Sequence, residues 1–524
     1  MSPRRLARSG TTAAIGKAMA RERSVFGMVA DLASLCARHA VQVLAGVATV
    51  TLVVRSLGAE GLGAWAVLGT AGFLVGLSDL GLSIAVQRAA AAGDDAATRR
   101  LVRLTLLVVA LVCPCLAACF YVFLLQAPAD AGALRQDLAR AAFPALTAGL
   151  AGSLAAPIRS FLLVRGAFSR LVWARAAASG IQVALTAVGL ALASSLLAPA
   201  LGLLAGSVLE LLLLALAARR VDPLLELRPG WPADRAEARE AFRQGAAALA
   251  MNVGVAAAVR ADVIILTTYA SLSTVGAYQV AARAVDQIHA LAKQTSGWLL
   301  HRLGDPAHRP GALRLGTAVL GGLVSSGVIA LALDGPSLLE AWVGGLAHDR
   351  VVAIAVGLLG TAAIIAAAEE MASTTLTVSG ATTWNVATPV LLGHALNLVL
   401  SLIGVRYAGA WAVAGGTVCG NLLIALLVWS KVRALVRWRW AEVLWTLAPV
   451  GAAGSVSLGV GWALAPFASR GPVASALSCS LVALIGTGVA LLVWWRRTRS
   501  SLGPAVLVAA HAPASQDATP APSP

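Results

Sequence analysis

The sequence predicts an all-α protein that crosses a membrane many times. Of its 524 residues, 59% are hydrophobic and 12% are charged, and the mean hydropathy is +0.82. Soluble domains carry about 25% charged residues. Apolar runs of about twenty residues, the length a helix needs to cross the hydrocarbon core, recur along the whole chain. Lipid offers the backbone no hydrogen-bond partners, and these runs are too long for barrel strands, so the spans are expected to be helices.

The apolar runs predict about fourteen spans, with ends placed to about three residues. The spans are expected at roughly 34–56, 61–86, 101–125, 141–164, 173–194, 197–218, 243–268, 274–299, 313–334, 351–377, 384–405, 408–430, 442–466 and 473–495. An even number of spans places both termini on the same side of the membrane.

The order of the spans predicts two six-helix lobes and two additional C-terminal helices. The expected segments are a cytoplasmic N-terminal segment (1–30), an N-lobe (31–220), a cytoplasmic inter-lobe loop (221–242), a C-lobe (243–430), a final helix pair (431–495) and a disordered cytoplasmic tail (496–524). Proline and glycine are frequent in the inter-lobe loop, and the tail is rich in Ala, Pro and Ser.

A short repeat supports this division. The segment from Gly61 to Trp65 (GLGAW) aligns with the segment from Thr274 to Tyr278 (TVGAY). Each begins the second span of its half. Equal halves of six spans share one orientation, so their pseudo-two-fold axis would lie along the membrane normal, with a binding site between the lobes.

Basic residues lie in short loops on alternate sides of the spans. The loops assigned to the cytoplasm, with the N-terminal segment, hold roughly thirty of them, and the opposite loops hold about six. Both termini are therefore expected in the cytoplasm. The net charge of +16 does not indicate nucleic-acid binding, because the basic residues form no patch on a soluble domain.

Nothing in the sequence predicts a catalytic or metal centre. The six cysteines lie in apolar runs, and Cys113, Cys115 and Cys119 lack histidine or acidic neighbours that would complete a metal site. No loop is long enough to hold a soluble catalytic domain. We expect neither a metal nor a cofactor, and no enzymatic activity.

Four arginines lie inside or at the edge of apolar spans: Arg38, Arg159, Arg260 and Arg283. A charged side chain at the bilayer centre costs about 3 kcal/mol or more, so such residues usually face a hydrated, protein-lined cavity. Arginine donates two parallel hydrogen bonds and stays protonated, which suits phosphate. We therefore expect these four residues to bind a diphosphate, with Arg260 and Arg283 at similar depth in adjacent antiparallel helices.

Acidic residues near these arginines leave two interpretations open. Asp79, Asp262 and Asp286 are candidates for ion coupling or for balancing charge. Alternatively, ion pairs between Arg38 and Asp79, Arg260 and Asp262, and Arg283 and Asp286 would only stabilise helix packing. Arg159 has no acidic residue nearby in its own span, which favours a ligand role for it. The sequence leaves H+, Na+ and the membrane potential open as driving forces, with Glu369, Glu370 and His394 as weaker candidates for carriers.

Several short motifs, in order, resemble bacterial polysaccharide flippases of the O-antigen and exopolysaccharide type. In the first half they run from Arg55 to Trp65 (RSLGAEGLGAW) and from Ser78 to Ser83 (SDLGLS). In the second half they are Arg260 to Ile265 (RADVII) and Val275 to Tyr278 (VGAY), then Leu338 to Gly344 (LLEAWVG), Asn397 to Leu400 (NLVL) and Tyr407 to Val413 (YAGAWAV). The flippases belong to the multidrug/oligosaccharidyl-lipid/polysaccharide exporter superfamily, with MATE drug exporters and lipid II flippases.

This resemblance implies two lobes around a central cavity in the bacterial inner membrane. It implies that an undecaprenyl-diphosphate-linked oligosaccharide is flipped from the cytoplasmic to the outer leaflet by alternating access. The expected partners are this lipid-linked oligosaccharide, membrane lipids, and polysaccharide polymerases or glycosyltransferases.

Other functions remain open at this stage. A lipid II flippase and a MATE-type ion-coupled exporter share the same fold class. The Pro-Asn and Arg-Arg-rich segment of lipid II flippases is not found after the second span, and an exporter of organic cations would need an anionic cavity. A membrane glycosyltransferase or polymerase would need a sizeable outer loop, and a silent scaffold for envelope assembly would need docking surface.

Overall fold

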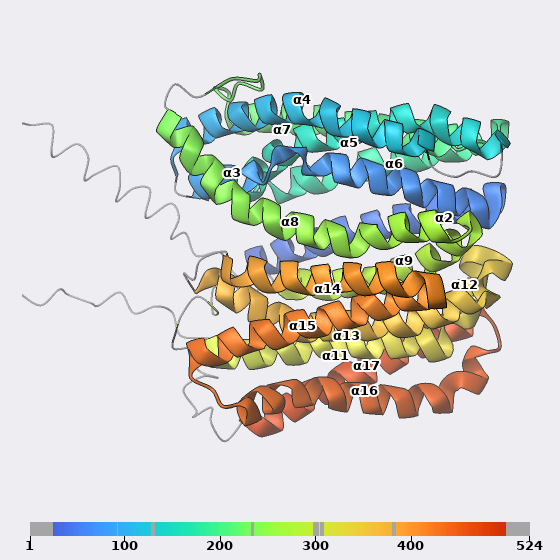
Figure 1. The fold of residues 1–524 in the computed structure, drawn as a ribbon. Coiled ribbons are helices and arrows are strands. Elements are labelled where there is room, and N and C mark those ends of the chain that lie inside the picture. The colour runs from blue at the N-terminus through green and yellow to red at the C-terminus, as the bar shows by residue number, and fades with distance from the viewer. Residues whose placement is uncertain are drawn as a thin grey trace, which may run out of the picture.

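The computed structural model describes residues 25–91, 93–126, 132–231, 235–296, 303, 306, 309–379 and 384–498. These residues form a bundle of long helices, without a strand in the described ranges (Figure 1). Eleven helices in this part of the chain are long and apolar enough to cross a membrane. The predicted all-α, polytopic membrane fold is confirmed.

The helices of the first half begin at residue 25 and end at residue 221. They are α2 (Val25–Val75), the short 3-10 helix η2 (Gly76–Asp79), α3 (Leu82–Ala91), α4 (Asp95–Gln126), α5 (Gly132–Val164), α6 (Phe168–Leu192) and α7 (Leu197–Val221).

The second half contains the remaining helices. They are α8 (Arg235–Tyr269), α9 (Leu272–Ser296), α11 (Arg309–Asp334), α12 (Pro336–Val343), the 3-10 helix η4 (Gly344–His348), α13 (Arg350–Val378), α14 (Trp384–Ala408), α15 (Ala410–Val436), α16 (Trp440–Ala468) and α17 (Pro472–Thr498).

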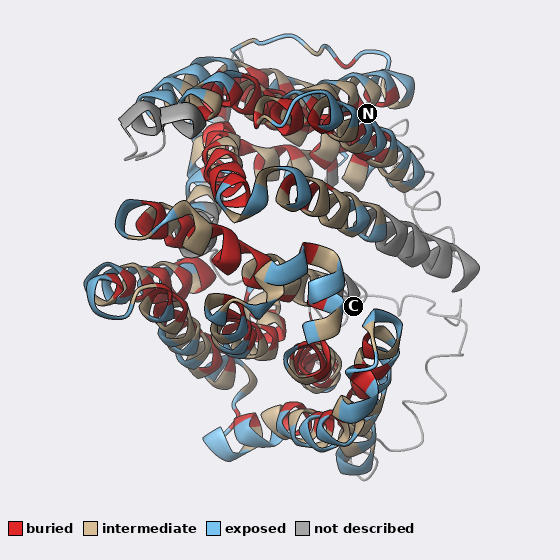
Figure 2. Cartoon of the chain, turned by 90° about the vertical axis from the view of Figure 1, so that its right-hand side faces the viewer, coloured by how far each residue is buried: buried red, intermediate tan, exposed pale blue. Residues whose placement is uncertain are grey.

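The surface of the bundle is apolar. Figure 2 shows buried residues concentrated where helices face each other and exposed residues on the outward faces. Several of the exposed residues are large and hydrophobic, such as Leu192 (83% exposed), Trp462 (79%) and Trp173 (74%). An outer surface of this kind is stable in lipid rather than in water.

The first two expected spans are joined in one helix, and the second of them is interrupted. A single helix, α2, covers both 34–56 and the start of 61–86, with a kink at Gly58, whose φ of 69° and ψ of −167° are accessible to glycine. The second span then breaks after Val75. Asp79 accepts a hydrogen bond from the backbone N–H of Gly81 at 3.0 Å, which stabilises a turn between η2 and α3. This local side-chain bond competes with the helical ladder.

α8 and α9 coincide with two expected spans but are not among the eleven strongly apolar helices. Their charged and polar residues lower their hydropathy. Both helices are covered by other helices instead: α9 packs against α2, α11 and α13, and α8 packs against α14, α3 and α2. In Figure 1, α9 lies in the middle of the molecule.

Helices of each half pack mainly with one another. In the first half, α5, α6 and α7 pack together, with α2, α3 and α4 against them. In the second half, α13, α14 and α15 form a similar group with α9 and α11. The final pair, α16 and α17, packs on α11.

The two repeat motifs contact each other where the halves meet. A Cβ atom at Gly63 would lie 2.0 Å from the backbone oxygen of Leu272, and one at Gly276 would lie 2.2 Å from that of Ala59. In the repeat alignment Gly276 is the counterpart of Gly63, and Leu272 is the counterpart of Ala59. The same contact is therefore made twice, as a two-fold axis between the halves requires.

Candidate functional site

Arg260 on α8 and Arg283 on α9 lie at similar depth. Arg260 precedes the end of α8 at Tyr269 by nine residues, and Arg283 follows the start of α9 at Leu272 by eleven. At 1.5 Å per residue, these positions are about 14 and 17 Å from the end of the bundle where the two helices are joined. Both guanidinium groups are therefore deep in the membrane-spanning part of the chain.

Both arginines are partly buried and lie beside exposed side chains. The Arg260 guanidinium lies over the ring of Phe73, with the carbon Cζ 4.8 Å from the ring centroid. Phe73 is 39% exposed, and Asp286, one turn beyond Arg283 on α9, is also exposed. α2 of the first half, which carries Phe73, packs against α9 of the second half, which carries Asp286. These exposed side chains therefore lie on helices that meet between the halves.

The charges at this site do not cancel. Asp286 interacts electrostatically with both Arg260 and Arg283. Among the residues that the structure describes, however, no carboxylate oxygen lies within 4.0 Å of either guanidinium. The ion pair of Arg283 with Asp286, which the sequence left open, is thus not formed. Two cations and one anion leave a net positive charge with donors available to a ligand.

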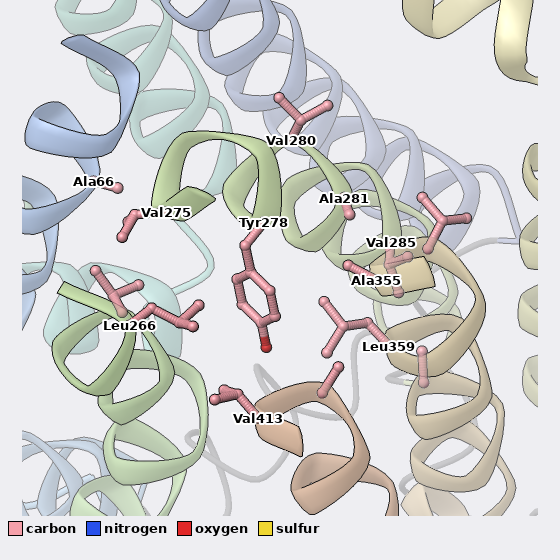
Figure 3. Close-up of a cluster of buried hydrophobic side chains, with 14 of the residues drawn as sticks. Ala66, Leu266, Val275, Tyr278, Val280, Ala281, Val285, Ala355, Leu359 and Val413 are labelled. Atoms are coloured by element: carbon pink, nitrogen blue, oxygen red, sulfur yellow. The ribbon is translucent and has the colours of Figure 1, made fainter. Parts of the chain in front are cut away.

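Asp262 does not pair with Arg260, although the sequence left that pair open. The two residues are two positions apart on α8 and therefore point in different directions. Asp262 is 4% exposed and accepts hydrogen bonds at Oδ2 from the Tyr278 hydroxyl, at 2.5 Å, and from the Thr417 hydroxyl, at 3.2 Å. Figure 3 shows the Tyr278 ring among Leu266, Val413 and Leu359, with its hydroxyl turned away from α9.

A cluster of oxygen atoms surrounds Asp262 inside the second half. The Thr417 hydroxyl lies 3.5 Å from Oδ1 of Asn397, which accepts another hydrogen bond from Ser401 at 3.0 Å. Oδ1 of Asp262 is buried and has no hydrogen-bond partner among the described residues. A carboxylate, an amide oxygen and hydroxyls are suited to hold a proton or a small hard cation. No group of three or more His, Cys, Asp or Glu residues capable of holding a metal ion occurs in the described ranges.

Arg159 is placed differently from the prediction. Its guanidinium binds Glu210 on α7 at 3.0 Å, and Arg175 on α6 binds the other oxygen of Glu210 at 2.9 Å. Glu210 is 6% exposed. Arg159 has no acidic residue nearby in its own span, as the sequence indicates, but it has an acidic partner on another helix of the same lobe, which removes the reason for favouring a ligand role.

Asp79 does not join the Arg260 and Arg283 site. It is buried and stabilises the turn after η2, whereas Arg159 bonds to Glu210 on α7. Arg38 lies in α2, and its side chain is outside the described residues.

Sequence reasoning missed some of the polar residues in these clusters. Glu210 is the single acidic residue in the expected span 197–218, which was a usable signal. Arg175 lies in the expected span 173–194 and was also passed over. Thr417 carried no signal, because one hydroxyl in an apolar helix is common and satisfies itself by bonding the preceding turn.

Comparison with known proteins shows where this arrangement of helices occurs. No family model matches the chain, and no curated protein matches its sequence. Solved structures do match its fold. A eukaryotic MATE transporter, AtDTX14, aligns with a TM-score of 0.60 and 14% identity, over 80% of this chain and 97% of the other.

Two further structures extend the likeness beyond drug exporters. The lipid II flippase MurJ, in an inward closed conformation, aligns with a TM-score of 0.57 and 14% identity, over 86% of this chain and 99% of MurJ. A MOP superfamily transporter from Pyrococcus furiosus, described as having a binding pocket of reverse polarity, aligns with a TM-score of 0.58 and 15% identity, over 78% of this chain and 94% of the other. The chain shares the fold of these structures. In this fold, Arg260 and Arg283 lie on α8 and α9 of the second half, which contact α2 of the first.

Proposed function

We propose that the protein is a flippase for a lipid-linked oligosaccharide diphosphate, which it moves between leaflets without chemical conversion. The observation that carries this proposal is the pair of deep, partly buried guanidinium groups, neither of which has a carboxylate oxygen within 4.0 Å among the described residues. Such a pair matches the two adjacent phosphates of a prenyl diphosphate, because each guanidinium can donate two parallel hydrogen bonds.

Net charge discriminates between this function and its closest alternative. An exporter of organic cations needs a site that attracts positive charge, whereas Arg260, Arg283 and Asp286 together carry one excess positive charge. The similarity to MurJ, a lipid II flippase, supports a substrate with a lipid anchor. We propose an undecaprenyl-diphosphate repeat unit as that substrate, on the polysaccharide-flippase motifs of the sequence, with lipid II as the second candidate.

Alternating access would move the substrate past this site. The reciprocal contact of Gly63 with Leu272 and of Gly276 with Ala59 joins the two halves at one end of the bundle. In the proposed cycle this contact opens and closes as the halves move as rigid bodies. The bacterial inner membrane, the cytoplasmic location of both termini, and association with polymerases or glycosyltransferases are parts of the same proposal.

We further propose that the Asp262 cluster holds the coupling ion, H+ or Na+. Tyr278 links this cluster to α9, the helix that carries Arg283 and Asp286. A cation bound at Asp262 would therefore change the position of α9, and with it the affinity of the arginines for the diphosphate.

Binding of a short prenyl diphosphate tests the site directly. Farnesyl diphosphate would be titrated into the purified protein by calorimetry, with Arg260→Gln and Arg283→Gln as variants. The matched control is Arg350→Gln, at the first residue of α13. We expect each deep variant to weaken binding by about tenfold to a hundredfold, since charge-assisted hydrogen bonds contribute about 1.5–3 kcal/mol each.

Alanine variants at the same two positions test transport. In cells that depend on the protein for glycan export, Arg260→Ala and Arg283→Ala should leave lipid-linked repeat units on the inner leaflet while the protein remains in the membrane. Normal export by both variants, or preferential binding of an organic cation over farnesyl diphosphate, would refute the proposed function.

A further inference from the structure

A second cationic cavity lies away from the centre, where the final helix pair packs on α11. It has a volume of about 190 Å³ and is lined by Arg314, Glu442, Trp445, Thr446, Trp494 and Arg497, among others. Arg314 is near the start of α11, Glu442 near the start of α16, and Arg497 near the end of α17. The cavity is therefore at one face of the bundle, at the level where helices leave the membrane.

Both arginines of this cavity are held by aromatic rings rather than by carboxylates. The Arg314 guanidinium lies over Trp438 at 4.9 Å, and that of Arg497 lies over Trp445 at 4.1 Å. Arg497 also donates a hydrogen bond to the backbone oxygen of Trp445 at 3.3 Å. Within the described part of the chain, neither guanidinium has a carboxylate oxygen within 4.0 Å. Stacking fixes the planes of these groups and leaves N–H donors at their edges free.

The one acidic residue of the cavity is already engaged. Oε2 of Glu442 accepts a hydrogen bond from the backbone N–H of Arg439 at 2.7 Å, as part of the cap of α16. Arg314, Arg497 and Glu442 together leave one positive charge. The cavity therefore attracts an anion with several acceptor oxygens.

The surface beside the cavity indicates what carries that anion. Trp445 is 58% exposed, Leu444 on α16 is 66% exposed, and Leu492 on α17 is 47% exposed. These residues continue from the cavity onto the apolar, lipid-facing sides of the same two helices. A ligand with a phosphate group and attached hydrocarbon chains fits both parts at once, and basic pockets between helix ends are known to bind such head groups.

We propose that this cavity binds the phosphate of an anionic phospholipid from the leaflet at that face, joining the α16–α17 pair to α11. The site is independent of the Arg260 and Arg283 site, and its occupancy does not require the proposed transport function. The bound lipid neutralises the excess charge where three helix ends meet.

Native mass spectrometry of the whole protein tests this proposal. The protein would be released from detergent with added phosphatidylglycerol or phosphatidylcholine, and lipid retention would be compared between the wild type and the double variant Arg314→Gln/Arg497→Gln. We expect the wild type to retain one phosphatidylglycerol that the double variant binds about tenfold more weakly. Phosphatidylcholine should show no such difference.

Two controls make the outcome specific. Arg350→Gln removes another stacked arginine, which lies 5.3 Å from Trp411 at the start of α13, and should retain the lipid as the wild type does. A conservative Arg314→Lys/Arg497→Lys variant keeps both charges and should recover most of the retention if the double glutamine variant folds poorly. Equal retention of phosphatidylglycerol by the wild type and the folded double glutamine variant would overturn the proposal, as would displacement of the lipid by millimolar inorganic phosphate.

Discussion

Arg260 and Asp262 are two positions apart on α8 and have unrelated neighbours. Arg260 lies over Phe73 of the first half, whereas Asp262 bonds Tyr278 and Thr417 inside the second half. Equal depth in the membrane, which the sequence predicts, does not place two side chains in one site, because residues two apart on a helix diverge by about 200°. The proposed diphosphate site and the proposed ion site are thus separate, and α9 carries residues of both.

The ion site makes a prediction for Asp262. Asp262→Asn keeps an oxygen that can accept from Tyr278 but removes the negative charge, so the cluster should lose its affinity for a cation. We expect the wild type to be stabilised against thermal unfolding by NaCl over choline chloride, or by lowered pH. This stabilisation should be absent in Asp262→Asn. In Thr417→Ala, the same stabilisation should require about a tenfold higher cation concentration. A variant with an unchanged response to both salt and pH would exclude Asp262 as the ion-binding residue.

Glu210 makes a prediction about stability. Its carboxylate is shared by Arg159 and Arg175, and Nε of each arginine is already buried without a partner among the described residues. Removing the shared charge breaks two ion pairs. Breaking a buried pair costs about 3–5 kcal/mol, and both arginine side chains are about a third exposed, so we expect a loss of about 2–3 kcal/mol for Glu210→Gln.

The measurement for Glu210 is thermal unfolding in detergent. The matched control is Glu226→Gln, which also removes a carboxylate shared by two arginines, Arg103 and Arg228, but one whose side chain is 46% exposed. The control should change the free energy of unfolding by less than about 1 kcal/mol. Equal effects of the two variants would show that the ion pairs of Glu210 contribute no more to stability than those of the more exposed Glu226.

At the scale of the elements, the repeat motifs act as a joint between α2 and α9. Only glycine permits the approach at positions 63 and 276, because any Cβ would overlap a backbone oxygen. Gly63→Ala and Gly276→Ala should therefore destabilise the protein by similar amounts, about 1–3 kcal/mol each, since they disturb equivalent contacts.

The control for this joint is on the same helix. A Cβ at Gly69 of α2 would have no atom within 4 Å, so Gly69→Ala should leave the melting temperature unchanged or slightly raised. Disulfide cross-linking between cysteines introduced at 59 and 272 would measure the separation of the two helices. Unequal effects of the two glycine variants would contradict a two-fold relation between the halves.

Local sequence predicts the elements better than their interruptions. The positions of α4 to α7, of α11 and of α13 to α17 follow from apolar length, which needs no knowledge of neighbours. The break after Val75 involves a local bond from the Gly81 N–H to Asp79, which apolar length does not report. The pair of Arg159 with Glu210 depends on the packing of α5 against α7, a tertiary contact that the order of residues alone does not contain. The depth match of Arg260 and Arg283 was predictable, because a short loop joins their helices.

At the scale of the whole molecule, ion pairs join the helix ends of one face. Arg99 at the start of α4 binds Asp222 after α7 at 2.8 Å, and Arg165 after α5 binds Asp95 at the start of α4. These residues belong to loops that the positive-inside rule assigns to the cytoplasm. The structure brings these loops together at one end of the bundle.

Orientation is therefore the last prediction. Cysteines would be introduced one at a time at positions 228, 435 and 345 of a variant without native cysteines and labelled in intact cells with a membrane-impermeant maleimide. Position 345 is in η4, at the end of the bundle opposite to the loop that contains 228 (Figure 1). We expect labelling at 345 only, because the excess of arginine at the other face is retained in the cytoplasm. Labelling at 228 and 435 but not at 345 would reverse the orientation, and the reciprocal glycine contact would then close the cytoplasmic end of the pathway instead of the outer end.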